Sequence, residues 1–283
     1  MRGREAAVQR VAAAVTAVLG AHATAHAAGP ENWQVGFGEP GSAIARLVME
    51  LHDRVILIGT VIVLIVLGLL IFIAWRYRAA RNPEASRVAR APLLEFAWTV
   101  LPIIIVGVIA VPSLAVLRFE ADIPPPELTV KVTGFQWFWR YEYPDHEGVA
   151  FDSLMLPDEE LEPGEPRLLE VDSRVVVPTG QVIEFLVTSG DVVHSFFIPT
   201  LGVQMYAIPG RLNSTWVKID RPGVYYGQCN QICGLDHSFM PIAIEARAPA
   251  DFEAWLASTK AGTTDGARLG TPPIAVASGE GVR

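Results

Sequence analysis

The residues best suited to chemistry lie in one short stretch late in the chain. Both cysteines are there, Cys229 and Cys233, and His237 and Met240 follow them. Thiolate, imidazole and thioether groups together suit copper, whereas a hard cation would take oxygen ligands. Another histidine, His194, lies at the end of an apolar segment that a β-sandwich can bring beside the cysteines. These residue types predict a metal site with soft ligands.

Each of these residues also has an ordinary interpretation when it is taken alone. Two cysteines in an exported domain can form a disulfide, and a single histidine or methionine often packs in a core. The joint spacing Cys-x3-Cys-x3-His-x2-Met favours a metal site instead. A mononuclear blue-copper site uses one cysteine, so the second cysteine favours a dinuclear copper site whose purpose is electron transfer.

Two apolar runs in the first half of the chain predict membrane spans. Residues 55–74 carry no charge, and neither do residues 96–117. About 20 helical residues cross a hydrocarbon layer ~30 Å thick, so we expect transmembrane helices over 55–75 and 93–118. The loop at 76–92 holds five arginines and one glutamate, an excess that marks the cytoplasmic side.

The two ends of the chain are predicted to lie outside the folded part. An arginine-bearing start, a short apolar run and the small-x-small motif at 25–27 indicate a secretory signal over residues 1–28. Residues 29–54 would then form a periplasmic segment. Residues 261–283 are small, polar and rich in Gly and Pro, and we expect a disordered tail there.

Between residues 119 and 260, short runs rich in Val, Ile, Thr and aromatic residues alternate with Pro, Gly and Asp. This pattern predicts an all-β periplasmic domain, an antiparallel sandwich or barrel. The predicted strands are 130–132, 137–143, 182–188, 215–219, 224–229 and 242–246. A short helix is predicted at 251–258.

The charge distribution restricts the partners. The chain has 283 residues with a net charge of −8, and only 18% of its residues are charged. Disorder is thereby excluded, and nucleic-acid binding is disfavoured. Residues 119–260 carry 21 acidic and nine basic side chains, a net charge of −12. This excess of acid either keeps the domain soluble or steers a cationic partner towards it.

Over residues 30–258 the sequence resembles subunit II of the haem–copper cytochrome c oxidases. The motifs that carry the resemblance are 134–143, 191–195, 207–213, 226–234 and 237–240. The resemblance implies a two-helix transmembrane hairpin followed by a cupredoxin-like sandwich. It also implies a dinuclear copper centre of the CuA type in that sandwich.

The resemblance assigns six ligands to that centre. Cys229 and Cys233 would bridge the two coppers. His194 and Met240 would complete one copper, and His237 with the backbone carbonyl of Gln231 would complete the other. Electrons would come from cytochrome c and pass to haem in subunit I, where O2 is reduced to water and protons are pumped. Subunit III and membrane lipid are further expected partners, and haem is expected only in the partner chain.

The resemblance also implies roles outside the metal site. Trp137 matches the position at which electrons enter. Alternation along a strand would place it on one face with Trp139 and Tyr141, and if that face is outward, its indole lies beside acidic residues as a docking patch. Core packing is the ordinary alternative for this aromatic run. Glu95 matches the mouth of a proton pathway, although it could be a plain interfacial carboxylate. Five acids match the surface that docks cytochrome c: Glu142, Asp145, Asp152, Asp172 and Asp191.

The sequence departs from the family pattern at Gln231. Gln231 stands where the family often has a glutamate that reaches Mg²⁺, and a neutral amide is a weaker ligand for that cation. Magnesium binding is therefore in doubt.

Three other functions are alternatives for the chain: a free-standing membrane-anchored copper carrier, a quinol oxidase subunit and the copper domain of a nitrous oxide reductase. Quinol oxidase subunits typically lack the copper ligands, and six histidines are too few for the reductase.

Overall fold

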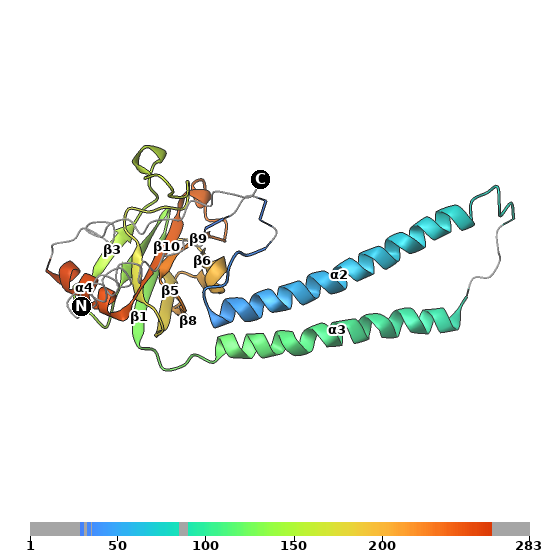
Figure 1. Ribbon diagram of the computed structural model, residues 1–283, viewed down its shortest axis with the longest axis horizontal. Helices are drawn as coiled ribbons and strands as arrows, with labels where there is room; N and C mark the ends of the chain where they lie inside the picture. Colours follow the sequence, from blue (N-terminus) through green and yellow to red (C-terminus); the bar gives the residue numbers. More distant parts are fainter. Residues whose placement is uncertain (1–28, 31–32, 35, 85–89, 262–283) are drawn as a thin grey trace, which may run out of the picture.

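The computed structural model describes residues 29–30, 33–34, 36–84 and 90–261. Two long helices extend side by side away from a compact β domain (Figure 1). A short helix, α4 (Pro249–Lys260), packs on that domain. The expected secretory signal and nearly all of the expected tail lie outside the described residues.

The two long helices are α2 (Ala43–Arg76) and α3 (Pro92–Ala121). Both are long and apolar enough to cross a membrane, and their most apolar stretches contain no buried residue. A helix of 34 residues is about 51 Å long, more than the ~30 Å of a hydrocarbon layer. The helix α2 therefore begins well before its apolar run. Its start is capped by Ser42, whose Oγ accepts a hydrogen bond from the Ala45 N–H at 3.0 Å.

Both helices are fastened to the β domain where they meet it. The Ser42 hydroxyl donates to the Leu201 carbonyl at 2.7 Å, and Ile44 and Ala45 are buried against the domain. Gly202 allows this approach, because a Cβ atom there would lie 2.8 Å from the Ala45 nitrogen. At the end of α3, the Trp216 indole donates to the Glu120 carbonyl at 3.1 Å. The β domain is thus attached to the helix pair at two points, the start of α2 and the end of α3.

The β domain is a sandwich of two five-stranded sheets. The first sheet contains, in order, β3 (Ala150–Ser153), β2 (Phe138–Glu142), β1 (Leu128–Phe135), β5 (Val182–Ser189) and β8 (Asn213–Lys218). The second contains β4 (Val175–Pro178), β10 (Pro241–Arg247), β9 (Gly223–Cys229), β6 (His194–Ile198) and β7 (Val203–Ala207). The expected hairpin and cupredoxin-like sandwich are confirmed.

Inward side chains of both sheets form one core. Ile183, Phe185 and Val187 alternate along β5 and are fully buried, as the period of two predicts. The expectation of purely antiparallel pairing is wrong, because β1 pairs with β5 and β4 pairs with β10 in parallel. In each pair the two strands are far apart in sequence, so no hairpin turn links them.

Two expectations about the aromatic run and His194 are also wrong. Trp139 and Tyr141 point into the core and are fully buried, whereas Trp137 lies in the turn before β2 and is half-buried. Their bulky apolar rings stabilise the sandwich more by burial than they could on an outer face. His194 begins β6 rather than ending a strand, because a turn at 190–193 separates β5 from β6.

A buried ionic network covers the outer face of β9 and β10. Glu170 is fully buried and accepts hydrogen bonds from Arg174 at 2.8 and 2.7 Å and from the Tyr226 hydroxyl at 2.6 Å. Arg174 also contacts Glu165 at 3.2 Å and Glu245 at 3.6 Å. Burial would lower the pKa of Arg174, but these carboxylates raise it, so the guanidinium stays charged. The network ties the segment before β4 to the strand that carries Cys229.

We expect Tyr226→Phe to lower the free energy of unfolding by about 1–3 kcal/mol, because it removes one donor from a buried carboxylate. Denaturant unfolding of the full chain in detergent, followed by circular dichroism, measures this change. Tyr206→Phe is the matched control, since Tyr206 is 45% exposed on the same sheet. We expect the control to change the free energy by less than about 0.5 kcal/mol. Equal values for the two variants would show that the Tyr226 hydroxyl contributes nothing to stability.

Candidate metal centre

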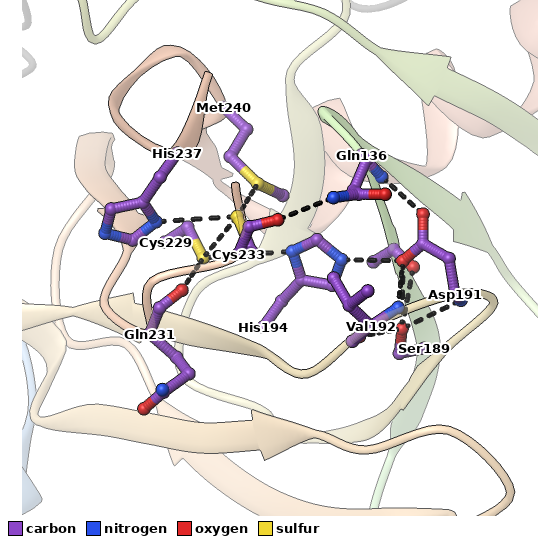
Figure 2. Close-up of polar contacts among 11 residues, drawn as sticks. Gln136, Ser189, Asp191, Val192, His194, Cys229, Gln231, Cys233, His237 and Met240 are labelled. Carbon is purple, nitrogen blue, oxygen red and sulfur yellow. Dashed lines mark hydrogen bonds and ion pairs between the residues drawn. The ribbon is translucent and has the colours of Figure 1, made fainter. Parts of the chain in front are cut away.

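Strand pairing brings His194 beside the cysteines. The strands β6 and β9 pair antiparallel with Phe196 opposite Cys229, and the Asn230 N–H donates to the Ser195 carbonyl at 3.2 Å. Cys229 ends β9, and the chain then loops out and returns at Pro241 to begin β10. This loop carries Cys233 and the short helix η3 (His237–Phe239). Two neighbouring strands and one loop therefore supply the whole cluster (Figure 2).

All six predicted ligands lie together around the two sulfurs. The Cys229 and Cys233 Sγ atoms are 3.9 Å apart, and both residues are free cysteines, each only 6% exposed. The Cys229 Sγ lies 3.9 Å from His194 Nδ1 and 3.3 Å from the Gln231 carbonyl oxygen. The Cys233 Sγ lies 3.5 Å from His237 Nδ1 and 3.6 Å from Met240 Sδ. Two thiols, two imidazoles, a thioether and a carbonyl fit copper, by the softness of the donors.

Residues behind the cluster fix the orientation of its members. His194 turns Nδ1 towards Cys229 and Nε2 towards Asp191, whose Oδ1 is 2.9 Å away (Figure 2). A carboxylate on the second ring nitrogen fixes the tautomer and the direction of a ligating imidazole. The Trp139 indole donates to the Met240 carbonyl at 3.2 Å, and its ring meets His194 edge-on. Sequence reasoning missed the support that Asp191 and Trp139 give, although the Asp-x-x-His spacing was a usable signal for Asp191.

The two thiols differ in their readiness to ionise. Burial would raise the pKa of Cys229, but hydrogen bonds with His194 and with backbone groups lower it below its usual value. Burial, followed by the charge of Cys229, raises the pKa of Cys233 to about 12. Burial would likewise lower the pKa of His194, but its hydrogen bonds to Cys229 and Asp191 raise it. The metal-free cluster therefore holds at least one proton that a metal must displace.

The acids predicted to dock a partner all have partners within the chain. Lys131 contacts Glu142 at 2.6 Å, and Arg140 binds Asp152 through two hydrogen bonds. Backbone N–H groups donate to the other three, from Thr129 to Asp145, from Leu154 to Asp172 and from Gln136 to Asp191. Their docking role stays a prediction. The five acids together present less negative charge than five carboxylates would, because Glu142 and Asp152 each contact a cation.

Glu95 lies in the first turn of α3, away from the β domain (Figure 1). Its Oε1 accepts a hydrogen bond from the Ala91 N–H at 3.1 Å. A carboxylate in this place satisfies a donor at the helix start and interacts favourably with the helix dipole. The structure therefore gives Glu95 a local role, and its proton-pathway role stays a prediction.

Comparison with known proteins decides the family. The periplasmic domain of cytochrome c oxidase subunit II matches residues 128–247, and the transmembrane domain of the same subunit matches residues 30–116. The chain belongs to the cytochrome c oxidase subunit II family. Its relatives include a probable cytochrome c oxidase subunit 2 of Rickettsia bellii, 48% identical over 81% of this chain and 85% of the relative. Subunit 2 of Arabidopsis thaliana is 41% identical over 81% of this chain and 90% of the relative.

A solved structure is also similar to the β domain. The periplasmic domain of subunit II of the Bradyrhizobium japonicum cytochrome oxidase is 47% identical, with a TM-score of 0.47. The match covers 50% of this chain and 100% of that domain. Family membership makes this chain a subunit of an oxidoreductase, the haem–copper oxidase, with two membrane spans and a periplasmic domain.

Copper affinity should rise with pH, because metal binding must displace the Cys233 proton. Below the raised pKa of this thiol, loss of one proton gives up to a tenfold gain in affinity per pH unit. Competition with a copper chelator between about pH 6 and pH 8 measures the slope. Cys233→Ser is the control, since it removes that thiol. A pH-independent affinity in the unaltered chain would contradict the proton displacement.

Proposed function

We propose that this chain accepts electrons for an aerobic terminal oxidase. It would take electrons from cytochrome c at a dinuclear copper centre of the CuA type and pass them to haem in subunit I. There O2 is reduced to water, and the reaction is coupled to proton pumping. The observation that carries the proposal is the pair of free, buried sulfurs 3.9 Å apart, with two imidazoles, a thioether and a carbonyl around them.

We assign the ligands as the family pattern has them. Cys229 and Cys233 would bridge both coppers, with His194 and Met240 on one and His237 and the Gln231 carbonyl on the other. The copper pair supplies a one-electron carrier when it is bound. The chain would contribute fixed ligand positions, because strand pairing and the Asp191 and Trp139 contacts hold the donors in place. We do not assign Mg²⁺ to Gln231, whose side chain is a neutral amide.

We further propose how the chain sits in the cell. The helices α2 and α3 would cross a bacterial inner membrane, with the arginine-rich loop in the cytoplasm and the β domain in the periplasm. Glu95 would lie at the cytoplasmic surface, where a proton pathway into subunit I could begin. Trp137 would receive electrons, since it is half-buried in a turn beside the cysteine loop.

The purified, copper-loaded chain should contain two copper ions that share one unpaired electron. Copper quantitation together with the electron-spin spectrum measures both properties, and a delocalised electron gives hyperfine coupling to two equivalent nuclei. Cys233→Ser should abolish this coupling, because one bridging sulfur is lost. A spectrum of a single isolated copper in the unaltered chain would refute the dinuclear site.

The rate of reduction by cytochrome c should fall as salt rises, because the Debye length is only about 10 Å at 0.1 M. Asp145→Asn and Asp152→Asn should each flatten this dependence, since each removes one negative charge and Asp152→Asn also leaves the Arg140 cation uncompensated. Rapid-mixing kinetics over a range of ionic strength test both expectations. A flat salt profile for the unaltered chain would exclude acidic steering.

A further inference from the structure

The turn that carries Trp137 is held to the cysteine loop by the residue before it. The Gln136 side-chain amide donates to the Cys233 carbonyl at 2.7 Å (Figure 2). The backbone N–H of Gln136 donates to Asp191 Oδ2, also at 2.7 Å. Gln136 thus joins the turn to a cysteine of the metal centre and to the carboxylate that orients His194.

The Trp137 ring is seated against the same loop. A Cβ atom on Gly234 would lie 2.8 Å from Cζ2 of Trp137 and 2.9 Å from Nε2 of Gln136. The ring and the Gln136 amide therefore both rest on the bare backbone that follows Cys233. Gly234 also has φ of +135°, a conformation that favours glycine.

The indole does not hold itself in this position by a hydrogen bond of its own. Trp137 Nε1 is buried and has no hydrogen-bond partner among the residues that the structure describes. Directional restraint on the turn comes from its neighbour Gln136, whose two hydrogen bonds reach the metal cluster from one side. Removing the side-chain bond leaves the backbone bond to Asp191 and packing to hold the turn, and no hydrogen bond from Gln136 to the cysteine loop.

We propose that Gln136 is a positioning residue for electron uptake. Its amide holds the Trp137 ring against the Cys233–Gly234 backbone, so that electrons cross from the indole to the metal centre through a fixed contact. Gln136 itself touches neither the electron donor nor the metal in this role. The inference rests on the proposed function, because it requires Trp137 to be the residue at which electrons enter.

The test compares Gln136→Met with the unaltered chain in the intact oxidase complex. Methionine keeps the length of the side chain and cannot donate a hydrogen bond to the Cys233 carbonyl. We expect reduction of the copper centre by cytochrome c to slow roughly tenfold, since about 1 Å of misplacement can cost up to 10²-fold in rate. The KM for cytochrome c, the spin spectrum and the copper midpoint potential should stay unchanged. Gln204→Met, at an exposed position on β7, is the matched control and should leave the rate unaltered.

A second readout does not depend on electron transfer. In the copper-free full chain, Gln136→Met should speed hydrogen–deuterium exchange in residues 134–138 and 232–236, because the bond between these segments is gone. Gln204→Met should leave exchange in both segments as it was. If Gln136→Met does not load copper, Gln136→Asn takes its place. The rates of copper reduction and of hydrogen–deuterium exchange are then measured for this variant, whose shorter side chain keeps the amide but moves it away from the Cys233 carbonyl.

Parallel measurement of Trp137→Phe separates the possible failures. If Trp137→Phe slows reduction and Gln136→Met does not, the positioning role is overturned and the proposed function stands. If Trp137→Phe leaves reduction unaltered, the assignment of Trp137 and the positioning role of Gln136 fall together. The inference would also be overturned if a shift of the copper midpoint potential fully explained the slower reduction in Gln136→Met. The hydrogen bond would then act on the potential of the copper centre and not on the position of Trp137.

Discussion

The structure depends on keeping two sulfurs close together without a bond between them. Cys229 and Cys233 are four residues apart, and their Sγ atoms lie 3.9 Å apart in a buried cluster. A helical turn would give similar spacing, but here β9 ends at Cys229 and a loop carries Cys233. The loop is held at both ends, because β9 pairs with β6 at one end and β10 begins at the other. This arrangement of two strands and a loop holds both sulfurs in the same metal-binding cluster.

The surroundings of the sulfurs show how a polar cluster is kept inside an apolar sandwich. Asp191 binds the far nitrogen of His194, Trp139 binds the Met240 carbonyl, and Gln136 binds the Cys233 carbonyl. Each contact restrains one member of the cluster from a different element. Farther out, the buried pair of Glu170 and Arg174 fastens a long segment to β9, and the ends of α2 and α3 fasten the domain to the membrane spans. A rigid centre lowers the structural change that accompanies electron transfer.

Much of this arrangement could be predicted from the sequence. The apolar runs are long enough to force two spans, and the alternation in β5 required a half-buried strand. The six residues of the cluster were found from their types and spacing and from the family motifs. Short strands were harder: β3 and β4 have four residues each, too few to show a period. The parallel pairings of β1 with β5 and of β4 with β10 could not be predicted, because they join segments that are far apart in the sequence.

The contacts behind the cluster were the least predictable part. The sequence leaves open whether Trp139 and Tyr141 face outward or pack in the core, since alternation alone does not say which face is buried. Gln136 lies in a family motif, but the sequence gives no sign of its bond to Cys233, because an amide beside a tryptophan is ordinary in any strand or turn. The internal partners of the five acids likewise depend on strand register, as in the pairing of Arg140 with Asp152. Such details appear only when the strands are placed.

Copper-edge X-ray absorption of the loaded, full-length chain tests the central claim most directly. If both sulfurs bridge two metals, the spectrum contains copper–copper scattering, and each copper has two sulfur neighbours at short distance. Lone copper without a metal neighbour, or a Cys229–Cys233 disulfide in the loaded protein, would contradict the account.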